Sequence, residues 1–396
     1  KLSTSGEFGG LGIVIAIRDG ALPVISPLDD TPASRAGVKA GDKITRIGEE
    51  STVNMNLEEA VKKLRGPKGT AVTIALLRKG IPEAKEYTLI RDTIKIKNVE
   101  SQLLSSDVGY IRVKGFQEDT GKDVGEQMKA LRAKSPDKKL KGVILDLRNN
   151  PGGLLDEAIR LSDLYLESGP IVTTVGVGNK LRDQKDARWP ETDKDTPVIV
   201  LTNGGSASAS EIVAGALKNR DRAVVLGEQT FGKGSVQNLF DLRDGSALKL
   251  TIAKYLTPGD VSIQSVGVTP DIETVPVKVG AEHIDLTGES RKFRESDLDR
   301  HFVTDEERVV HDKPTLSLRF IEGEYTPPKG KYNTLDVPKD KQPKEAPTPA
   351  KPEEGEEEID PEYRKTADLT KDFEVQLAMN LLKQGGSNSR KKMLSS

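Results

Sequence analysis

The sequence predicts an α/β protein: a parallel sheet with crossover helices, a small mixed β domain before it and a polar tail after it. Two nearly continuous apolar runs, residues 143–147 and 198–202, each end in a glycine-rich turn that leads into a helical pattern. Such runs are typical of parallel strands buried on both faces. The length of 396 residues suggests two or three domains.

Residues 1–93 have the pattern of the small mixed β domain. Apolar alternation predicts strands, and cap residues followed by helical spacing predict short helices. The expected strands are 13–17, 24–26, 42–47 and 72–78, and the expected helices are 31–37 and 57–64. The turn Gly9-Gly10-Leu11-Gly12 precedes the first strand, and its glycines can present bare backbone N–H groups.

Residues 94–275 alternate between strand and helix patterns, as parallel strands with crossover helices do. The expected strands are 108–116, 143–147, 198–202, 223–227 and 248–255, and the expected helices are 119–134, 154–166 and 209–217. Active sites of such sheets lie beyond the carboxyl ends of the strands. The two glycine-rich turns, after residues 147 and 202, stand at that edge.

Residues 276–396 form a C-terminal extension that is mostly tail. Its linker, 337–362, is rich in Pro, Lys and Glu, so it cannot bury enough apolar surface to order itself, and the tail is expected to be partly disordered. Helical spacing returns at 370–383. A lone amphipathic helix usually covers an apolar surface, so we expect it to dock on its own protein or to dimerise rather than to stand free.

Residue counts exclude several classes of function. The chain has 60 basic and 62 acidic residues, a balance that gives no field to hold nucleic acid or an anionic membrane. It has no cysteine, which excludes disulfides, thiolate nucleophiles and cysteine-bound metals. The three histidines, at 283, 301 and 311, leave the first 280 residues without a Ser–His–Asp triad or a histidine-bound metal. We therefore expect no metal and no cofactor. No apolar stretch approaches the roughly 20 residues of an integral membrane segment.

Ser208 is a candidate nucleophile because it stands where a buried strand gives way to a helix. At a helix start the next backbone N–H, that of Ala209, points toward a developing oxyanion, and the helix dipole adds to the effect. Two alternatives stay open. Ser208 and Glu211 also have the spacing of a capping box, and Ser206 and Ser210 compete for the role.

A serine nucleophile needs a base, and without a histidine that base would be a neutral lysine. A lysine acts near neutral pH only after its pKa falls from about 10.4 to about 7, which requires burial or nearby positive charge. Lys233, in Phe-Gly-Lys-Gly-Ser, is the candidate; the alternative is a surface or phosphate-binding lysine, although the P-loop spacing is absent. Asp146 is a further candidate, but an aspartate at a strand end is more often structural.

The N-terminal segment resembles a PDZ domain of the circularly permuted bacterial kind. The resemblance rests on the pattern SPLDDTPASRAGVKAGDKITRIG at 26–48, which follows the glycine turn. In PDZ domains the N–H groups of this turn hold a peptide's C-terminal carboxylate, and the peptide adds as a strand beside the next β-strand. The resemblance implies a peptide-binding site at Gly9, Gly10, Leu11, Gly12 and Ile13.

Three motifs together resemble the carboxyl-terminal processing proteases, which are tail-specific serine peptidases with a PDZ domain. The motifs are Asp-Leu-Arg-Asn-Asn-Pro-Gly-Gly at 146–153, the stretch 203–217, and Gly-Glu-Gln-Thr-Phe-Gly-Lys-Gly-Ser-Val-Gln at 227–237. The resemblance covers about residues 6–275. It implies a ClpP/crotonase-like peptidase core at 94–275, after the PDZ domain at 1–93.

The same resemblance assigns roles to matching residues. Ser208 is the nucleophile and Lys233, 25 residues later, is the general base. Gln237 orients the lysine, and if both share one strand, alternation puts them on the same face. The oxyanion amides come from Ala209 together with Gly152 or Gly153, and the sequence does not decide between the two glycines.

The implied function is an ATP-independent serine endopeptidase whose PDZ domain captures apolar C-termini of protein substrates. The resemblance also implies an exported, periplasmic protein whose signal region is absent from this sequence, a homo-oligomer, and an adaptor protein as a further partner. Two other functions remain open. One is a binding protein with an inactive α/β scaffold, and the other is a crotonase-like acyl-CoA enzyme, which would need neither the PDZ domain nor the serine–lysine pair.

Overall fold

The computed structural model describes most of the chain. The described residues are 6–17, 20–28, 30–78, 80–95, 97–105, 107–176, 182–188, 192–241, 246–279, 284–285, 294–297, 312–321 and 369–395. The linker expected at 337–362 and the three histidines lie outside these residues. Among the described helices, none combines the length and apolar character that crossing a bilayer requires.

The N-terminal unit folds around its own apolar core. Its elements are β1 (Glu7–Gly10), β2 (Ile13–Ile15), β3 (Leu22–Pro27), α1 (Pro32–Arg35), β4 (Lys43–Ile47), β5 (Glu50–Ser51), α2 (Leu57–Leu64), β6 (Ala71–Leu77), β7 (Lys85–Ile90) and β8 (Asp92–Lys95). One sheet has the order β2-β3-β4-β6-β7, with β5 against β4, and β1 pairs with β8 in a second sheet. The strand β2 is therefore an edge strand, to which a further strand can be added.

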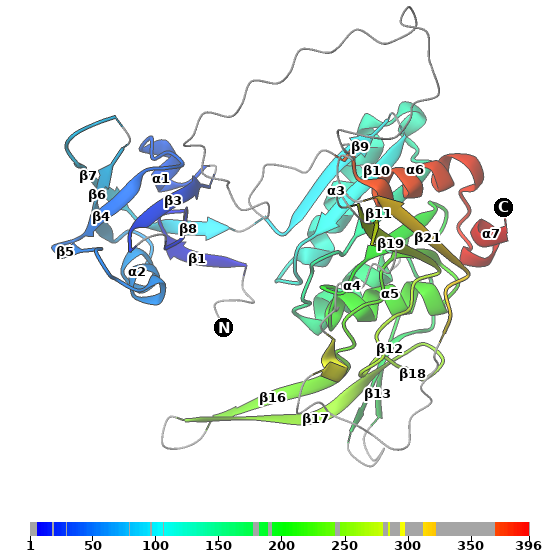
Figure 1. Ribbon diagram of the computed structural model, residues 1–396. Coiled ribbons are helices and arrows are strands. Elements are labelled where there is room, and N and C mark those ends of the chain that lie inside the picture. Colours follow the sequence, from blue (N-terminus) through cyan, green and yellow to red (C-terminus); the bar gives the residue numbers. More distant parts are fainter. Residues whose placement is uncertain are drawn as a thin grey trace, which may run out of the picture.

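The central sheet carries the predicted parallel strands (Figure 1). Its members are β9 (Val99–Leu104), β10 (Val108–Val113), β11 (Gly142–Asp146), β14 (Val198–Thr202), β15 (Ala223–Gly227), β19 (Ile272–Val279), β20 (Ile284–Asp285) and β21 (Leu316–Ile321). The order is β20-β19-β15-β14-β11-β10-β9, and β21 pairs with β19. The strands from β10 to β19 run parallel, so the carboxyl ends of β11 and β14 meet at one edge.

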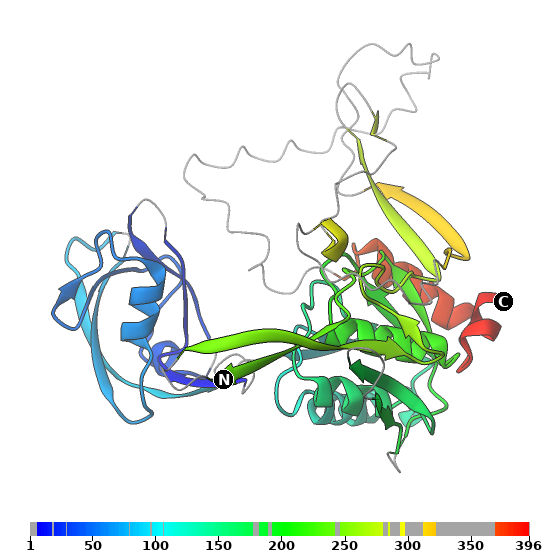
Figure 2. The same ribbon diagram turned by 90° about the horizontal axis from the view of Figure 1, so that it is seen from below.

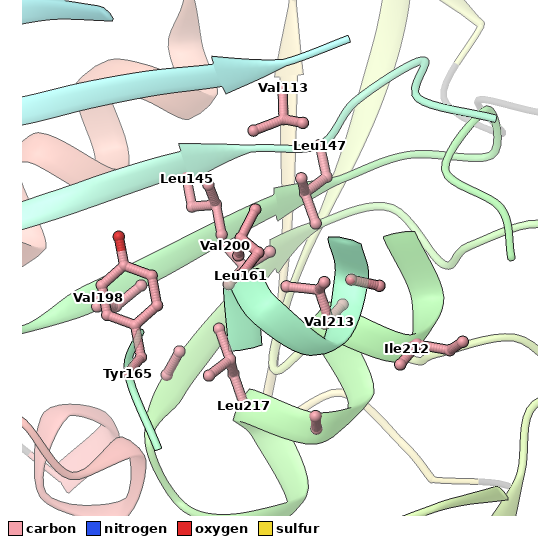
Figure 3. Packing of buried hydrophobic residues seen from close by; sticks show 14 of the residues in the cluster. Val113, Leu145, Leu147, Leu161, Tyr165, Val198, Val200, Ile212, Val213 and Leu217 are labelled. Carbon is pink, nitrogen blue, oxygen red and sulfur yellow. The ribbon is translucent and has the colours of Figure 1, made fainter. Parts of the chain in front are cut away.

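Three helices cover one face of this sheet. They are α3 (Thr120–Lys134), followed by the 3₁₀ turn η1 (Pro136–Lys138), α4 (Leu155–Asp163) and α5 (Ala209–Asn219). Alternate residues of β11 and β14 point into this layer, where they pack with apolar residues of the helices (Figure 3). The residues that meet there include Leu145, Leu147, Val198, Val200, Leu161, Val213 and Leu217, all fully buried. This packing fixes where α5, and with it Ser208, begins.

Two C-terminal helices cover the opposite face, α6 (Phe373–Gly385) and α7 (Arg390–Ser395). Val375, Ala378 and Leu382 of α6 pack on the other set of alternating strand residues, among them Ile144 and Ile199. The helix expected at 370–383 therefore docks on its own protein. Residues far beyond the peptidase motifs complete the hydrophobic core.

A second sheet lies beside the core and ends in a projecting arm (Figure 2). Its strands are β12 (Pro170–Gly176), β13 (Arg182–Asp186), β16 (Ser235–Asp241), β17 (Ala247–Thr257) and β18 (Val261–Ser262), in the order β13-β12-β17-β16 with β18 against β17. The short 3₁₀ turn η3 (Glu295–Asp297) comes later in the chain. The arm is the hairpin of β16 and β17, and β16 begins two residues after Lys233.

The predicted α/β class and the mixed β domain before it are confirmed. The C-terminal part differs from the expectation of a tail. Strand β19 runs through residue 275 to Val279, and β21 adds a further strand beside it. Elements from beyond residue 275 thus belong to the central sheet, because β19 has an open edge and an apolar face that β21 and α6 cover.

Candidate active site

Ser208 sits in a strained turn between β14 and α5. Its φ is 56° and its ψ is −112°, a conformation that a residue with a side chain rarely adopts. Such strain persists only where the surroundings impose it, and it is concentrated at functional sites. The side chain is half-buried. Among the described residues, no hydrogen bond engages its hydroxyl with another side chain.

The two competing serines are held in structural contacts. The hydroxyl of Ser206 donates to the Leu147 carbonyl at 2.8 Å, and the hydroxyl of Ser210 donates to the Asn150 carbonyl at 2.9 Å. Both serines are fully buried. They tie the turn after β14 to the turn after β11, which leaves Ser208 as the serine of this motif that is open to a substrate.

The glycine turn after β11 lies directly against Ser208. A Cβ on Gly152 would stand 2.9 Å from the Ser208 Cβ and 3.0 Å from the Ala209 nitrogen, so only glycine fits. The Gly152 N–H donates to Asn150 Oδ1 at 2.9 Å. Among the described residues, no hydrogen bond uses the N–H of Gly153 or Ala209. Of the two glycines left open by the sequence, Gly153 is the one whose N–H is unengaged.

Glu211 joins the serine turn to the lysine loop. Its Oε2 accepts the backbone N–H groups of both Ser208 and Lys233, each at 2.8 Å. Its Oε1 accepts from the Thr230 hydroxyl at 2.6 Å and from the Gly232 N–H at 2.7 Å. The side chain is fully buried, and this burial raises the pKa of the carboxyl to about 7, although the four donors act in the opposite direction.

The capping-box spacing of Ser208 and Glu211 pointed to a local role for the carboxylate at the start of α5. The structure has this capping box, in which the Ser208 N–H donates to Glu211 at 2.8 Å, and in addition it has the link from Glu211 to Lys233. Sequence reasoning did not find this second role, because it depends on the return of the chain 22 residues later. The sequence did carry one signal for this role, since Glu211 is the only charged residue in a motif of small residues.

Lys233 lies in a loop that is packed tightly on its neighbours. The Phe231 N–H donates to the Ser206 carbonyl at 3.0 Å, and the Gly234 N–H donates to Gln264 Oε1 at 2.9 Å. A Cβ on Gly234 would come within 2.7 Å of the Gln264 nitrogen. The Lys233 side chain is half-buried. Within the described residues, no hydrogen bond joins Lys233 Nζ to Ser208 Oγ.

The structure does not put Gln237 and Lys233 on one strand, which the sequence argument required. Lys233 precedes β16 and Gln237 lies inside it, with a register shift between Val236 and Gln237. The two residues therefore do not share a regular strand, and alternation cannot put them on one face. The Gln237 side chain is exposed.

Asp146 and Arg148 form a buried ion pair on the face of the sheet that α6 covers. Arg148 donates to Asp146 at 2.9 Å through Nε and at 2.6 Å through Nη2, and the Tyr110 hydroxyl donates to Asp146 at 2.7 Å. Arg148 and these donors hold the pKa of Asp146 below its usual range despite complete burial. This carboxylate is fully engaged, so its role is structural.

The N-terminal unit has a small groove at the predicted peptide site. A cavity of about 70 Å³ lies between the glycine turn with β2 and the helix α2. It is lined by Phe8, Gly10, Leu11, Gly12, Ile13, Ile15, Val61, Leu64 and Arg65. Gly9 does not line it, because Gly9 packs against Gly66, where a Cβ would come within 2.0 Å of the Gly66 carbonyl oxygen. In the described part of the turn, the N–H groups of Leu11 and Gly12 make no hydrogen bond.

Fold and site together define an α/β core with a strained serine and a glycine-flanked lysine, preceded by a peptide-groove domain. Residues 107–274 match the model of peptidase family S41, and residues 1–77 match the model of the PDZ domain. The chain belongs to peptidase family S41, and its N-terminal unit is a PDZ domain.

The chain is also similar to curated proteins that are named carboxyl-terminal processing proteases. The chain is 47% identical over 270 residues to the carboxy-terminal-processing protease of Bartonella bacilliformis, covering 68% of this chain and 62% of the relative. It is 40% identical over 278 residues to the carboxyl-terminal-processing protease of Synechocystis, covering 68% and 64%. The matches thus span a little under two thirds of these relatives. Among solved structures, a photosystem II D1 C-terminal processing protease is 30% identical, covers 68% of this chain and 73% of its own, and has a TM-score of 0.42.

Proposed function

We propose that this chain is an ATP-independent serine endopeptidase that recognises substrate C-termini through its PDZ domain. Ser208 Oγ attacks the carbonyl carbon of the scissile peptide bond while Lys233 Nζ accepts the hydroxyl proton. The N–H groups of Ala209 and Gly153 stabilise the oxyanion. The amine product leaves with a proton from the lysine, and water then hydrolyses the acyl-enzyme. Gln237 remains in the proposal as the residue that orients the lysine.

One observation carries this proposal: the carboxylate of Glu211 binds the backbone N–H groups of Ser208 and Lys233 through a single oxygen, at 2.8 Å each. A contact of this kind holds the turn with the nucleophile and the loop with the base at a fixed separation. Two strained or glycine-rich segments that meet on one buried carboxylate are difficult to explain by folding alone. They are expected where two side chains must react together.

The PDZ groove supports capture of a small apolar C-terminus. Its cavity of about 70 Å³ has an apolar lining from β2 and α2, and the free N–H groups of Leu11 and Gly12 stand at its edge. A peptide added beside the edge strand β2 would place its carboxylate at these N–H groups. An exported, periplasmic location, a homo-oligomer and an adaptor are further parts of the proposal, and they rest on the family alone.

The test is cleavage of an unfolded protein such as casein by the full chain. We expect Ser208→Ala and Lys233→Ala each to reduce cleavage below detection, whereas the surface variants Ser168→Ala and Lys139→Ala keep wild-type rates. Full activity in either of the first two variants contradicts the mechanism. Peptide binding without any cleavage by the wild type would favour a binding protein, and hydrolysis of an acyl-CoA thioester would favour a crotonase-like enzyme.

A further inference from the structure

The start of the C-terminal helix α6 contacts the segment that leads into the oxyanion turn. The contact runs through Arg148, whose five N–H groups are all used. Nε and Nη2 bind Asp146 as described, Nη1 and Nη2 donate to Asp372 at 3.2 and 2.8 Å, and Nη1 donates to Glu374 Oε2 at 2.7 Å. One guanidinium thus joins β11 to residues more than 220 positions later in the chain.

The cluster of Arg148, Asp372 and Glu374 is largely buried, and its opposite charges attract one another. The side chain of Arg148 is 16% exposed, and those of Asp372 and Glu374 are 20% and 10% exposed. Burial raises the pKa of Glu374, while Arg148 and the hydroxyl of Thr274 act against that rise. A buried guanidinium with fork-like contacts to carboxylates has a narrowly defined position. Loss of the two helix carboxylates would leave donors of Arg148 unsatisfied, which is strongly unfavourable.

Arg148 directly precedes the turn, Asn149 to Gly153, that carries the oxyanion glycines. Two residues later, Asn150 accepts the N–H of Gly152 at 2.9 Å through Oδ1 and the N–H of Ala207 at 3.0 Å through its carbonyl. The Asn150 side chain donates to the Val113 carbonyl at 2.8 Å. A shift of Arg148 therefore moves the start of a short, cross-linked turn whose other end lies against Ser208.

Docking of the helix does not by itself require these charges. The apolar side chains of Val375, Ala378 and Leu382 are already fully buried against the sheet. The far end of the C-terminal segment has its own anchor, because Arg390 binds Asp271 at 2.5 Å through Nη2. The acidic pair at the start of α6 is thus additional to what holds the helix in place.

We propose that Asp372 and Glu374 are positioning residues for the reaction: they hold Arg148, and through it the turn from Asn149 to Gly153, in the geometry that binds the oxyanion. This inference rests on the proposed function of that turn. It makes the catalytic rate depend on a helix that contributes no group to the site, and detachment of α6 at its first turn would lower the rate without unfolding the core.

The test compares Asp372→Asn/Glu374→Gln with Arg390→Ala in the full chain. The amides keep the helix cap, since the side-chain oxygen at position 372 can still accept the Val375 N–H, but they remove both charges facing Arg148. The Arg390→Ala change loosens the same C-terminal segment at its other end. Asp372→Glu with Glu374 intact keeps both carboxylates and serves as the conservative variant.

We expect the double variant to lose about tenfold or more in kcat on a peptide with an apolar C-terminus, with KM within about twofold, because only the transition state uses the turn N–H groups. Hydrogen exchange of the fragment 147–154 should accelerate in the same variant. Arg390→Ala should lower Tm but leave both readouts unchanged, and Asp372→Glu should retain most of kcat.

Unchanged exchange at 147–154 in the double variant overturns the inference, whether or not the wild type cleaves peptides. Equal losses of kcat in the double variant and in Arg390→Ala, in line with equal losses of Tm, also overturn it, because both would then act through stability. A wild type without peptidase activity contradicts the proposed function, and in that case the exchange result alone decides whether α6 positions the turn.

Discussion

The molecule has two glycine turns that offer backbone N–H groups to an oxygen atom, and they are supported very differently. The PDZ turn is anchored mainly by backbone hydrogen bonds: the carbonyls of Gly9, Leu11 and Gly12 accept the N–H groups of Gly66, Ala33 and Leu28 at 3.1, 3.0 and 2.8 Å, and Gly12 also accepts the Thr31 hydroxyl at 3.3 Å. The turn after β11 is tied by hydroxyls, amides and a buried guanidinium to β10, to the serine turn and to α6.

The difference follows from what each turn binds. A peptide carboxylate carries its full charge before and after binding. A turn can therefore bind it even when the turn's N–H groups are only approximately positioned. An oxyanion exists only during the reaction, and donors stabilise it well only if they are already aimed at its position. Changes near the peptidase turn should therefore alter rates by orders of magnitude, and changes near the PDZ turn should alter affinity a few-fold.

Among changes that leave Ser208 and Lys233 in place, the largest effect is expected from Gly153→Ala. The φ of Gly153 is +146°, and a Cβ there would come within 2.1 Å of the Phe116 carbonyl oxygen, which is backbone and cannot move aside cheaply. The turn must shift, so casein cleavage should fall by about 10²-fold or more, while binding of a C-terminal peptide to the PDZ domain stays unchanged.

Gly259→Ala is the matched control for that substitution. Gly259 also has a positive φ, +86°, but its nearest neighbour would be Val261 Cγ2 at 3.9 Å. It should cost about 1 kcal/mol of stability through strain alone and keep the wild-type rate. Similar cleavage rates in the two variants would contradict a special role for the Gly153 backbone.

Glu211→Gln should have the next largest effect. A neutral amide offers one acceptor oxygen in place of two, so the link between the serine turn and the lysine loop is weakened and we expect kcat to fall about 10²-fold. Glu157→Gln is the control, because Glu157 on α4 is also buried and also accepts a backbone N–H, that of Gly121 on α3 at 2.8 Å, but it contacts neither the serine turn nor the lysine loop in the described residues. Wild-type kcat in Glu211→Gln would refute the linking role.

The same carboxyl predicts opposite trends of activity and stability with pH. Its folded pKa is about 7 against an ordinary value of 4.5, so it ionises, and can accept all four donors, only as the pH rises through 7. Activity should rise there. The contribution to folding has the other sign: it is fully present below about pH 4.5 and is lost as the pH rises to 7. Urea unfolding of wild type and Glu211→Gln at pH 5 and 7.5 measures this, and equal pH dependence in both proteins would exclude Glu211 as the source.

The local pattern of the sequence was sufficient for the fold class, for the helices that cover the central sheet and for that sheet's inner strands. The strand at 198–202, the strand at 223–227 and the helix at 57–64 were predicted with the bounds that the structure has. In these segments the apolar residues follow a clear pattern, and a glycine or a cap residue marks where the element begins or ends. The strands β7, β9, β12, β13, β16, β19 and β21 were not predicted. For β13, Arg182–Asp186, the reason is physical: its five residues are all polar, so no apolar alternation marks it as a strand.

The sequence indicated the motifs of the candidate site, but it did not indicate the contacts that join these motifs to one another. Ser208 and Lys233 could be named as candidates from local sequence and were given their roles by the family resemblance, but the shared carboxylate of Glu211 and the contact of α6 with Arg148 depend on contacts between distant segments. The alternation argument for Gln237 required one shared strand, and it does not apply because Lys233 lies before β16 and a register shift follows Val236. Its proposed role now rests on family resemblance.

The smallest effect is expected at the PDZ groove. Arg65 lines the cavity and places its guanidinium 4.2 Å from the centre of the Phe8 ring, so it adds positive charge near the N–H groups of the turn. Because the side chain is exposed, Arg65→Ala should weaken binding of a free-acid peptide by only about two- to fivefold, and less in high salt. Lys62→Ala, an exposed cation of α2 outside the cavity, should have no effect. An amidated peptide should lose the Arg65 dependence, so equal losses for free-acid and amidated peptides would show that Arg65 supports the pocket through Phe8 rather than through the carboxylate.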